Sequence, residues 1–310
     1  MKLVTFNRLN SRNNEIGIVI DTQIAVLDGD GNPQFSSMLA LIEAGPEGLE
    51  AARQAMPACE RIQYSDVRLL APLPRPVQMR DALTFEKHLR QARANRYIFD
   101  PKQPKRNPDE VELPQIWYDQ PIYYKCNRFS VSGPEDEIIW PLGETRLDYE
   151  LELGAVIGKG GGDIARADAL DHIFGFVIFN DFSARDHQIA EMAGGLGPAK
   201  GKDFRTANAL GPWLVTRDEI GDGSGLNMVA RVNGKEWSRG NSSSMHHDFS
   251  RVIEHISRDE DLHPGEFIGS GTVGGGCGLE LGRFLQPGDV VELEIDGLGV
   301  LRNTISKKRD

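Results

Sequence analysis

Polar and apolar residues alternate strictly in the segment 148–154, which reads Asp-Tyr-Glu-Leu-Glu-Leu-Gly. An alternation of period two is typical of a β-strand with one solvated and one buried face. It puts Asp148, Glu150 and Glu152 on the same side of the strand, with the apolar residues opposite. Three acidic groups on one strand face repel one another unless a positive charge lies among them. A divalent cation is the simplest such charge.

A further acidic position follows about thirty residues later. Asp181 comes directly after the apolar run 173–179 and its following Asn, so it could lie on a neighbouring strand. A ligand set made only of oxygen atoms suits Mg²⁺, Mn²⁺ or Ca²⁺ better than zinc. Taken alone, a Glu-x-Glu pair is more often part of an ordinary solvent-facing strand. The metal interpretation therefore depends on the rest of the chain.

The same kind of pattern predicts a small N-terminal α+β domain. Its expected strands and helices lie at residues 2–6, 16–20, 23–27, 35–44 and 46–56. A strand and a proline-broken linker at 66–76 indicate a domain boundary near residue 70. We therefore expect one domain over residues 1–70 and a larger one over 71–310.

In the larger domain, strand patterns dominate from residue 122 onward. They are preceded by an expected helix at about 81–97 and by a polar, proline-rich insertion at 100–114. One amphipathic helix is expected near 248–257, and the last segment predicts a β-hairpin that turns at Asp296-Gly297. The 34 glycines and 17 prolines also favour a turn-rich, mostly β architecture over a helical bundle.

Composition excludes several classes of function. The net charge of -11 argues against a nucleic-acid surface. No apolar stretch approaches the ~20 residues that span a bilayer, so no membrane role is expected. The first residues lack an apolar signal core, which makes the cytoplasm the expected location. Three cysteines at unrelated spacings indicate reduced thiols, and neither a disulfide framework nor a zinc site.

Several familiar motifs are matched only in part. The segment 269–274 fits G-x-G-x-x-G, but more glycines follow it where a dinucleotide site needs a helix. The acidic segment 28–32 resembles a calcium loop, but Pro33 and Leu39 stand where such a loop needs Gly and Glu. The glycine-rich segment 158–162 lacks the spacing of a phosphate-binding loop, and a G-x-S-x-G elbow does not occur.

His88 is a candidate for acid–base chemistry. It lies seven residues after Asp81 in the expected helix, and seven positions return nearly to the same helix face, two turns along. If Asp81 faces the carboxylate cluster, His88 can reach the same pocket. The alternative is a surface histidine on an exposed amphipathic helix, which is the commoner case for a lone histidine.

Six motifs in register resemble those of the fumarylacetoacetate hydrolase family, over about residues 70–305. They are, in order, Asp148-Tyr-Glu150-Leu-Glu152, Asn180-Asp181-x-Ser-Ala-Arg185-Asp186, Gly201-Lys202-x-Phe204, Leu210-Gly211-Pro-Trp213, Gly271-Thr272 and Gly288-Asp289-Val-Val-Glu. The resemblance implies a mostly β fold with some α (α+β), a mixed β-sandwich roll of the fumarylacetoacetase C-terminal type with a small N-terminal domain. It also implies a homodimer.

The resemblance further implies roles for individual residues. The metal ligands would be Glu150, Glu152 and Asp181, with Asp81 as a fourth in the fumarylacetoacetase branch. His88 would be the catalytic base, oriented by Glu280, and Lys202 would adjoin the metal carboxylates as a third catalytic group. The implied substrate-binding residues are Gln188, Thr272 and Arg185. The implied cofactor is a divalent cation, Mg²⁺ or Mn²⁺, with Ca²⁺ as a further option.

The sequence departs from this branch around the expected substrate pocket. Leu83 replaces a tyrosine soon after Asp81, and Met192 and Ala193 stand where another tyrosine is found. The insertion 100–114 could also change the shape of the pocket. These departures leave the metal chemistry in place and put the identity of the substrate in doubt.

The resemblance and the candidate residues together predict a metal-dependent hydrolase that cleaves a C–C bond in a β-diketo acid, of the acylpyruvate or fumarylacetoacetate type. The partner would be a small keto acid. The alternative is a 2-keto acid lyase (a dehydratase, hydratase or decarboxylase) on the same scaffold, which shares the metal ligands and need not use the His88–Glu280 pair. A non-catalytic metal-binding protein is a third interpretation, disfavoured by the number of acid–base groups.

Overall fold

A long twelve-stranded sheet organises the chain, whose computed structural model describes residues 1–9 and 11–308. In spatial order its main path is β4 (Arg61–Gln63), β3 (Gln23–Leu27), β2 (Glu15–Ile20), β1 (Lys2–Arg8), β14 (Asn208–Thr216), β12 (Ile173–Asp181), β11 (Leu151–Ile157), β17 (Phe267–Gly269), β6 (Met79–Ala82) and β7 (Tyr123–Lys125). Beside this path, β5 (Val67–Leu69) pairs with β1, and β8 (Val131–Ser132) pairs with β14.

Two smaller sheets complete the β structure. The five-stranded sheet has the order β16 (Lys235–Asn241), β15 (Asn227–Val232), β18 (Val290–Ile295), β19 (Gly299–Ile305) and β9 (Glu137–Ile138), and the two-stranded sheet pairs β10 (Leu147–Asp148) with β13 (Ser183–Ala184). The helices are α1 (Met38–Glu43), α2 (Gly45–Ala55), α3 (Glu86–Ala94), α4 (Gln115–Asp119), α5 (Arg185–Met192), α6 (Ala199–Lys202), α7 (Arg217–Ile220), α8 (Phe249–Ile256) and α9 (Gly278–Leu281). Among the described residues, none of these helices is long and apolar enough to cross a membrane.

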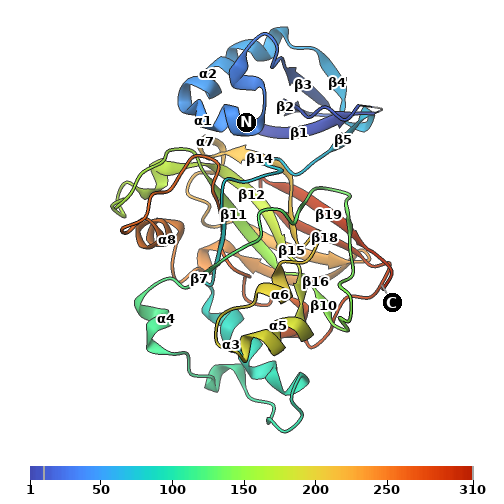
Figure 1. Cartoon of the computed structure of the whole chain (residues 1–310), viewed down its shortest axis with the longest axis vertical. Helices are drawn as coiled ribbons and strands as arrows, with labels where there is room; N and C mark the ends of the chain where they lie inside the picture. Colours follow the sequence, from blue (N-terminus) through green and yellow to red (C-terminus); the bar gives the residue numbers. More distant parts are fainter. Residues whose placement is uncertain (10, 309–310) are drawn as a thin grey trace.

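The N-terminal strands and helices form a lobe at the top of Figure 1. The strands and helices expected between residues 2 and 56 are confirmed, with boundaries that differ by a few residues. Ser37 caps α1, since its hydroxyl accepts a hydrogen bond from the Ala40 N–H at 3.1 Å. The lobe shares its sheet with the rest of the chain, because Leu3 of β1 pairs with Leu214 of β14. A domain division near residue 70 stays a prediction.

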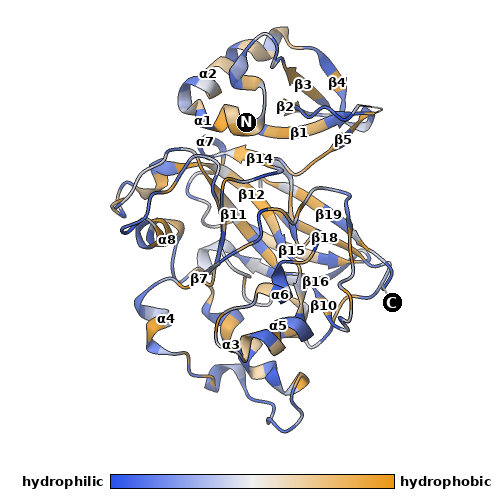
Figure 2. Cartoon of the chain, in the orientation of Figure 1, coloured by the Kyte–Doolittle hydropathy of each residue, from blue (hydrophilic) through white to orange (hydrophobic). Residues whose placement is uncertain are grey.

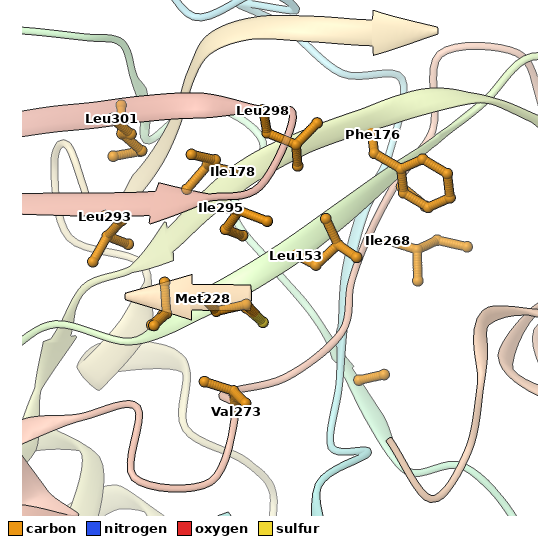
Figure 3. Close-up of a cluster of buried hydrophobic side chains, with 14 of the residues drawn as sticks. Leu153, Phe176, Ile178, Met228, Ile268, Val273, Leu293, Ile295, Leu298 and Leu301 are labelled. Carbon is orange, nitrogen blue, oxygen red and sulfur yellow. The ribbon is translucent and has the colours of Figure 1, made fainter. Parts of the chain in front are cut away.

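A sandwich of the two larger sheets encloses the main hydrophobic core. In Figure 3, Leu153 of β11 and Ile178 of β12 lie close to Leu293, Ile295 and other residues of the five-stranded sheet. Hydrophobic residues follow β11, β12 and β14 through the centre of the molecule in Figure 2. The predicted fold class, mostly β with some α, is confirmed, as is the hairpin at Asp296-Gly297, which joins β18 to β19.

The predicted solvated face of the strand 148–154 is wrong, because every residue of β11 is buried. The apolar side chains on one face, such as Leu153, fill the sandwich core. Glu152 on the other face is 0% exposed and Glu150 is 4% exposed. The alternating residues therefore face two buried regions. The apolar residues face the sandwich core, and the acidic residues face a buried polar region and not the solvent.

The helix predicted at about 81–97 is wrong in its first part. Residues Met79–Ala82 form β6, which pairs in parallel with β17 and antiparallel with β7. The helix α3 begins only at Glu86. Pairing with β17, nearly 190 residues away in the chain, overrides the local helical pattern. Asp81 and His88 therefore lie on different elements. The predicted amphipathic helix near 248–257 is confirmed as α8.

Candidate active site

A cavity of about 400 Å³ lies where β6, β7 and β11 meet the helices α3, α5 and α6. It is lined by the following residues that the sequence singled out: Asp81, His88, Glu150, Glu152, Arg185, Gln188, Lys202 and Thr272. The two remaining predicted residues, Asp181 and Glu280, contact this lining from behind, through Lys202 and His88 respectively. The structure thus brings the whole predicted set together around one cavity.

Three carboxylates from three strands meet at one end of the cavity. Asp81 comes from β6, Glu152 from β11 and Asp181 from the last position of β12. One oxygen atom of each lies within 4.8 Å of the others. All three residues are buried. The neighbouring strand order of β12, β11, β17 and β6 is what places these three side chains side by side.

A backbone N–H group also faces this cluster. Gly271, in the loop after β17, donates to Oδ1 of Asp81 and to Oε2 of Glu152, each at 3.1 Å. Its φ of +79° is a conformation that favours glycine. A Cβ atom at this position would lie 2.3 Å from the carbonyl oxygen of Ala82. Glycine is therefore required here for the close approach of the backbone to the two carboxylates.

Glu150 does not belong to the close trio, because two cations hold it. Nζ of Lys202 lies 2.5 Å from Oε2 of Glu150 and 2.5 Å from Oδ2 of Asp181. A guanidinium nitrogen of Arg185 lies 2.7 Å from Oε1 of Glu150. Lys202 and Arg185 thus supply positive charge among the acidic groups, for which the sequence had suggested a divalent cation. They neutralise Glu150 and one side of Asp181, whereas Asp81 and Glu152 form no ion pair with any residue that the structure describes.

The pKa values of the four carboxyl groups follow this division. Burial, together with the charge of Asp181, raises the pKa of Asp81 to about 7. Burial and the neighbouring acids also hold the pKa of Glu152 well above its usual range. Burial raises the pKa of Asp181 to about 6, although Lys202 works against that rise. For Glu150 burial acts in the same direction, but Lys202 and Arg185 outweigh it and lower the pKa.

The trio fits a hard divalent cation. Oδ2 of Asp181 accepts hydrogen bonds from Lys202 and from the hydroxyl of Tyr124, at 2.5 and 2.7 Å. Its other oxygen, Oδ1, is buried and has no hydrogen-bond partner among the described residues. A buried carboxylate oxygen without a partner is costly, and a cation would satisfy it. The donors are all oxygen, which suits Mg²⁺, Mn²⁺ or Ca²⁺.

His88 and Glu280 form a buried hydrogen-bonded pair on the cavity wall. Nδ1 of His88, on α3, bonds to Oε1 of Glu280, on α9. The second oxygen of Glu280 accepts from the backbone N–H of Gly275. The side-chain amide of Asn95 fixes α9 against α3 by donating to the carbonyls of Leu279 and Glu280, at 2.8 and 2.9 Å. Burial alone would lower the pKa of His88, but Glu280 raises it overall.

The three residues predicted to bind substrate are held in fixed positions. Arg185 donates to Oδ2 of Asp148 at 2.7 and 2.9 Å, and to the side-chain oxygen of Gln188 at 2.9 Å. The hydroxyl of Thr272 donates to Oε1 of Glu152 at 3.2 Å. All three side chains line the cavity beside the carboxylates.

Sequence reasoning missed Tyr124, whose hydroxyl bonds to Asp181 and which lines the cavity. It lies on the three-residue strand β7, too short for a periodic signal. The departures Leu83 and Met192 do line the cavity. None of the residues 100–114, all of which the structure describes, does so. Val111 and other apolar residues of this insertion pack against α3 instead, so the insertion supports the helix that carries His88.

Comparison with known proteins gives one family. Residues 79–306 match the family described as fumarylacetoacetate (FAA) hydrolase C-terminal. A human mitochondrial oxaloacetate tautomerase is 32% identical over 272 residues, which are 87% of this chain and 79% of that protein. A putative hydrolase of Burkholderia cenocepacia is 39% identical over 182 residues, which are 58% of this chain and 64% of that protein. The chain thus spans somewhat less than two thirds of the length of this relative.

The fold is shared with a solved structure as well. Maleylpyruvate hydrolase from Sphingobium sp. SYK-6, in complex with manganese(II) and pyruvate, has a TM-score of 0.75 at 24% identity, and the likeness covers 100% of both chains. At this identity the likeness concerns the fold. The proteins named in these matches are enzymes, among them hydrolases and a tautomerase. Because the family match covers most of the chain, the protein belongs to the fumarylacetoacetate hydrolase family.

Proposed function

We propose that this protein is a metal-dependent hydrolase that cleaves a C–C bond in a β-diketo acid of the acylpyruvate or fumarylacetoacetate type. The observation that carries the proposal is the hydrogen bond between His88 and Glu280 on the wall of the same cavity that holds the carboxylate trio. A base oriented by a carboxylate, next to a cation site, is the arrangement needed to activate water against a polarised carbonyl.

Asp81, Glu152 and Asp181 would hold the cation, with Glu150 beside them as the partner of Lys202. When bound, Mg²⁺ or Mn²⁺ supplies a Lewis acid that polarises the keto acid and favours the enolate that leaves. Two observations support this assignment. Oδ1 of Asp181 is buried without a hydrogen-bond partner among the described residues, and burial and nearby acids raise the pKa values of Asp81 and Glu152. The manganese ion and pyruvate in the maleylpyruvate hydrolase belong to a protein of the same fold.

His88 would act as the general base. Because Nδ1 is engaged by Glu280, the other ring nitrogen, Nε2, is left to take a proton from water. The water oxygen then bonds to the distal carbonyl carbon, the adjacent C–C bond breaks, and the departing enolate receives the proton. The products of an acylpyruvate are a carboxylic acid and pyruvate. General base catalysis of this kind contributes about 10²–10⁴ in rate.

Lys202 would contribute positive charge near the developing enolate. Burial alone would lower its pKa, but Asp181 and Glu150 raise it, so the ammonium group stays charged. Arg185, Gln188 and Thr272 are placed to contact the polar groups of the keto acid, since all three line the cavity next to the carboxylates. Fixed donors of this kind stabilise charge in the transition state without reorganisation.

Keto–enol tautomerisation of a keto dicarboxylic acid is the second candidate. It is favoured by the human oxaloacetate tautomerase, which matches 87% of this chain. The reaction needs a base that moves a proton between carbon and solvent beside a polarised carbonyl, and His88 could serve for that proton transfer without attack by water. The same cavity residues therefore support both reactions, and only the role of water differs.

The two candidates and the lyase alternative are separated by their products. Purified protein with Mg²⁺ or Mn²⁺ is assayed against a panel of acylpyruvates, sugar-derived keto acids and the enol form of oxaloacetate. Release of pyruvate together with a carboxylic acid supports the hydrolase. Loss of enol absorbance without any cleavage product supports the tautomerase, and turnover of a sugar-derived keto acid alone supports the lyase.

A further inference from the structure

A second group of metal-ligating side chains lies next to the carboxylate trio, and its chemistry is different. His88, Cys277 and Glu280 each offer one ligand atom, and these three atoms all lie within 4.8 Å of one another. The group combines nitrogen, sulfur and oxygen donors, whereas the trio at Asp81 offers oxygen alone. All three residues are buried, and Cys277 is 0% exposed. The proposed hydrolysis makes no use of Cys277. The cysteine spacing in the sequence gave no indication of this mixed group, because His88 lies far along the chain from the other two members and the group includes only one cysteine.

We propose that His88, Cys277 and Glu280 form a binding site for a thiophilic cation such as Zn²⁺, separate from the oxygen site for Mg²⁺ or Mn²⁺. Thiolate and imidazole ligands favour zinc, whereas carboxylates alone favour harder ions. Three protein ligands with one open position are typical of accessible zinc sites. Of the three residues, His88 alone lines the cavity, so the ion would lie behind the cavity wall.

One distance within the group already suits such an ion. Sγ of Cys277 lies 3.6 Å from Oε1 of Glu280. Zinc–sulfur and zinc–oxygen bonds of about 2.3 and 2.0 Å, at a tetrahedral angle, place these two ligand atoms roughly 3.5 Å apart. Nδ1 of His88 lies closer to Glu280, as a hydrogen-bond partner. An ion that binds both atoms replaces this hydrogen bond, and the two atoms must then separate to roughly 3.3 Å.

The backbone fixes Cys277 at this position. Cys277 forms an isolated antiparallel bridge with Glu150, and the neighbouring N–H of Leu151 bonds to the carbonyl of Gly276. Cys277 is also the residue that precedes α9, which carries Glu280 three residues later. The sulfur therefore approaches the His88–Glu280 pair from a rigid element, and such rigidity lowers the cost of organising a metal site.

Burial and the nearby charge of Glu280 hold the pKa of the Cys277 thiol well above its usual range. The thiol is therefore protonated without an ion, and binding of zinc must release that proton. Zinc binding also withdraws His88 from water activation. If the proposed hydrolysis is correct, zinc is an inhibitor that leaves the magnesium site intact. The binding itself does not depend on the proposed reaction.

The test uses the purified full chain with excess Mg²⁺, titrated with Zn²⁺ in a calorimeter and separately with Co²⁺ in a spectrophotometer. We expect one zinc equivalent and a thiolate-to-cobalt charge-transfer band. Cys277→Ser should bind zinc at least tenfold more weakly and lose the band. The matched control is Cys59→Ser, in the N-terminal lobe, where the half-buried thiol donates to the carbonyl of Ala55 at 3.3 Å. The Cys59→Ser variant should keep the zinc affinity and the cobalt charge-transfer band of the unmodified protein.

Equal zinc affinity in Cys277→Ser and Cys59→Ser would overturn the proposal, as would cobalt binding without a thiolate band in the unmodified protein. If Cys277→Ser does not fold, His88→Gln takes its place and should weaken the band in the same way. Magnesium affinity, measured in each variant, distinguishes this site from the oxygen site. Zinc binding with these properties in a protein that hydrolyses no diketo acid would support this site and contradict only the proposed hydrolysis.

Discussion

The ammonium group of Lys202 lies 2.5 Å from Oδ2 of Asp181, while Oδ1 of the same carboxylate has no hydrogen-bond partner among the described residues. One oxygen is thus neutralised within the protein, and the other is buried in a carboxylate that groups with those of Asp81 and Glu152. A buried, unpaired carboxylate oxygen is unfavourable unless something outside the chain satisfies it. We interpret Lys202 as setting which oxygen of Asp181 remains for a cation.

Asp181→Asn should abolish metal-dependent activity and leave the fold largely intact. The amide keeps the shape of the side chain but removes the charge that holds a cation. Glu150→Gln should also abolish the activity, because it removes the carboxylate that holds Lys202 in place beside Asp181. Metal affinity is measured by calorimetry, and folding by circular dichroism. The control Asp168→Asn changes an exposed carboxylate and should bind metal normally. Full activity of the unmodified protein in excess chelator would contradict this prediction.

Stabilisation by Mg²⁺ or Mn²⁺ should increase with pH. The pKa values of Asp81, about 7, and Asp181, about 6, exceed the value of about 3.9 for Asp in unfolded chains. The folded, metal-free protein therefore binds protons more tightly than the unfolded chain, and its stability falls as pH rises from about 4 to about 7. A cation replaces these protons.

Thermal unfolding with and without metal measures this effect. The metal-free protein should have a lower Tm at about pH 8 than at about pH 5.5, and added metal should raise Tm more at the higher pH. An equal rise in Tm at both pH values would contradict this prediction. It would show that the cation does not displace protons from Asp81 and Asp181.

The sequence predicted some elements well because their signals are local. The alternation at Glu150 and Glu152 predicts β11, and the turn at Asp296-Gly297 predicts its hairpin. The helix at Asp81 was wrong because β6 has only four residues and exists through its pairing with β17, which no local pattern reveals. The contact between His88 and Glu280 joins residues 192 positions apart, and only the resemblance to a family indicated it. Tyr124 had no signal at all.

His88 and Glu280 should act as a unit. His88→Ala should lower kcat about 10²–10⁴-fold, and the double variant with Glu280→Gln should be little worse, since the carboxylate then has no base to orient. Affinity for Mg²⁺ or Mn²⁺ should change little because neither residue belongs to the oxygen trio. Steady-state kinetics of the two single variants and the double variant measure this. Additive losses, or an active His88→Ala variant, would place water activation elsewhere and favour the lyase, which need not use the His88–Glu280 pair.

The protein should form a homodimer through the strand-rich part of the chain, as the resemblance implies. Exposed strand edges and apolar side chains gain by being covered, and two-fold dimers are the commonest assemblies. Phe129, beside β8, is 73% exposed, and Leu142 is 60% exposed. Light scattering at micromolar concentration should give about twice the chain mass of 34.3 kDa. A monomer mass would refute the prediction.

Release of pyruvate from an acylpyruvate by metal-free protein, before and after addition of Mg²⁺ or Mn²⁺, tests the central claim most directly. Pyruvate and the matching carboxylic acid should appear in equal amounts only after the metal is added, and Asp181→Asn should release neither. Pyruvate release at the same rate without metal, or no cleavage of any acylpyruvate by the metal-loaded protein, would contradict the proposed function.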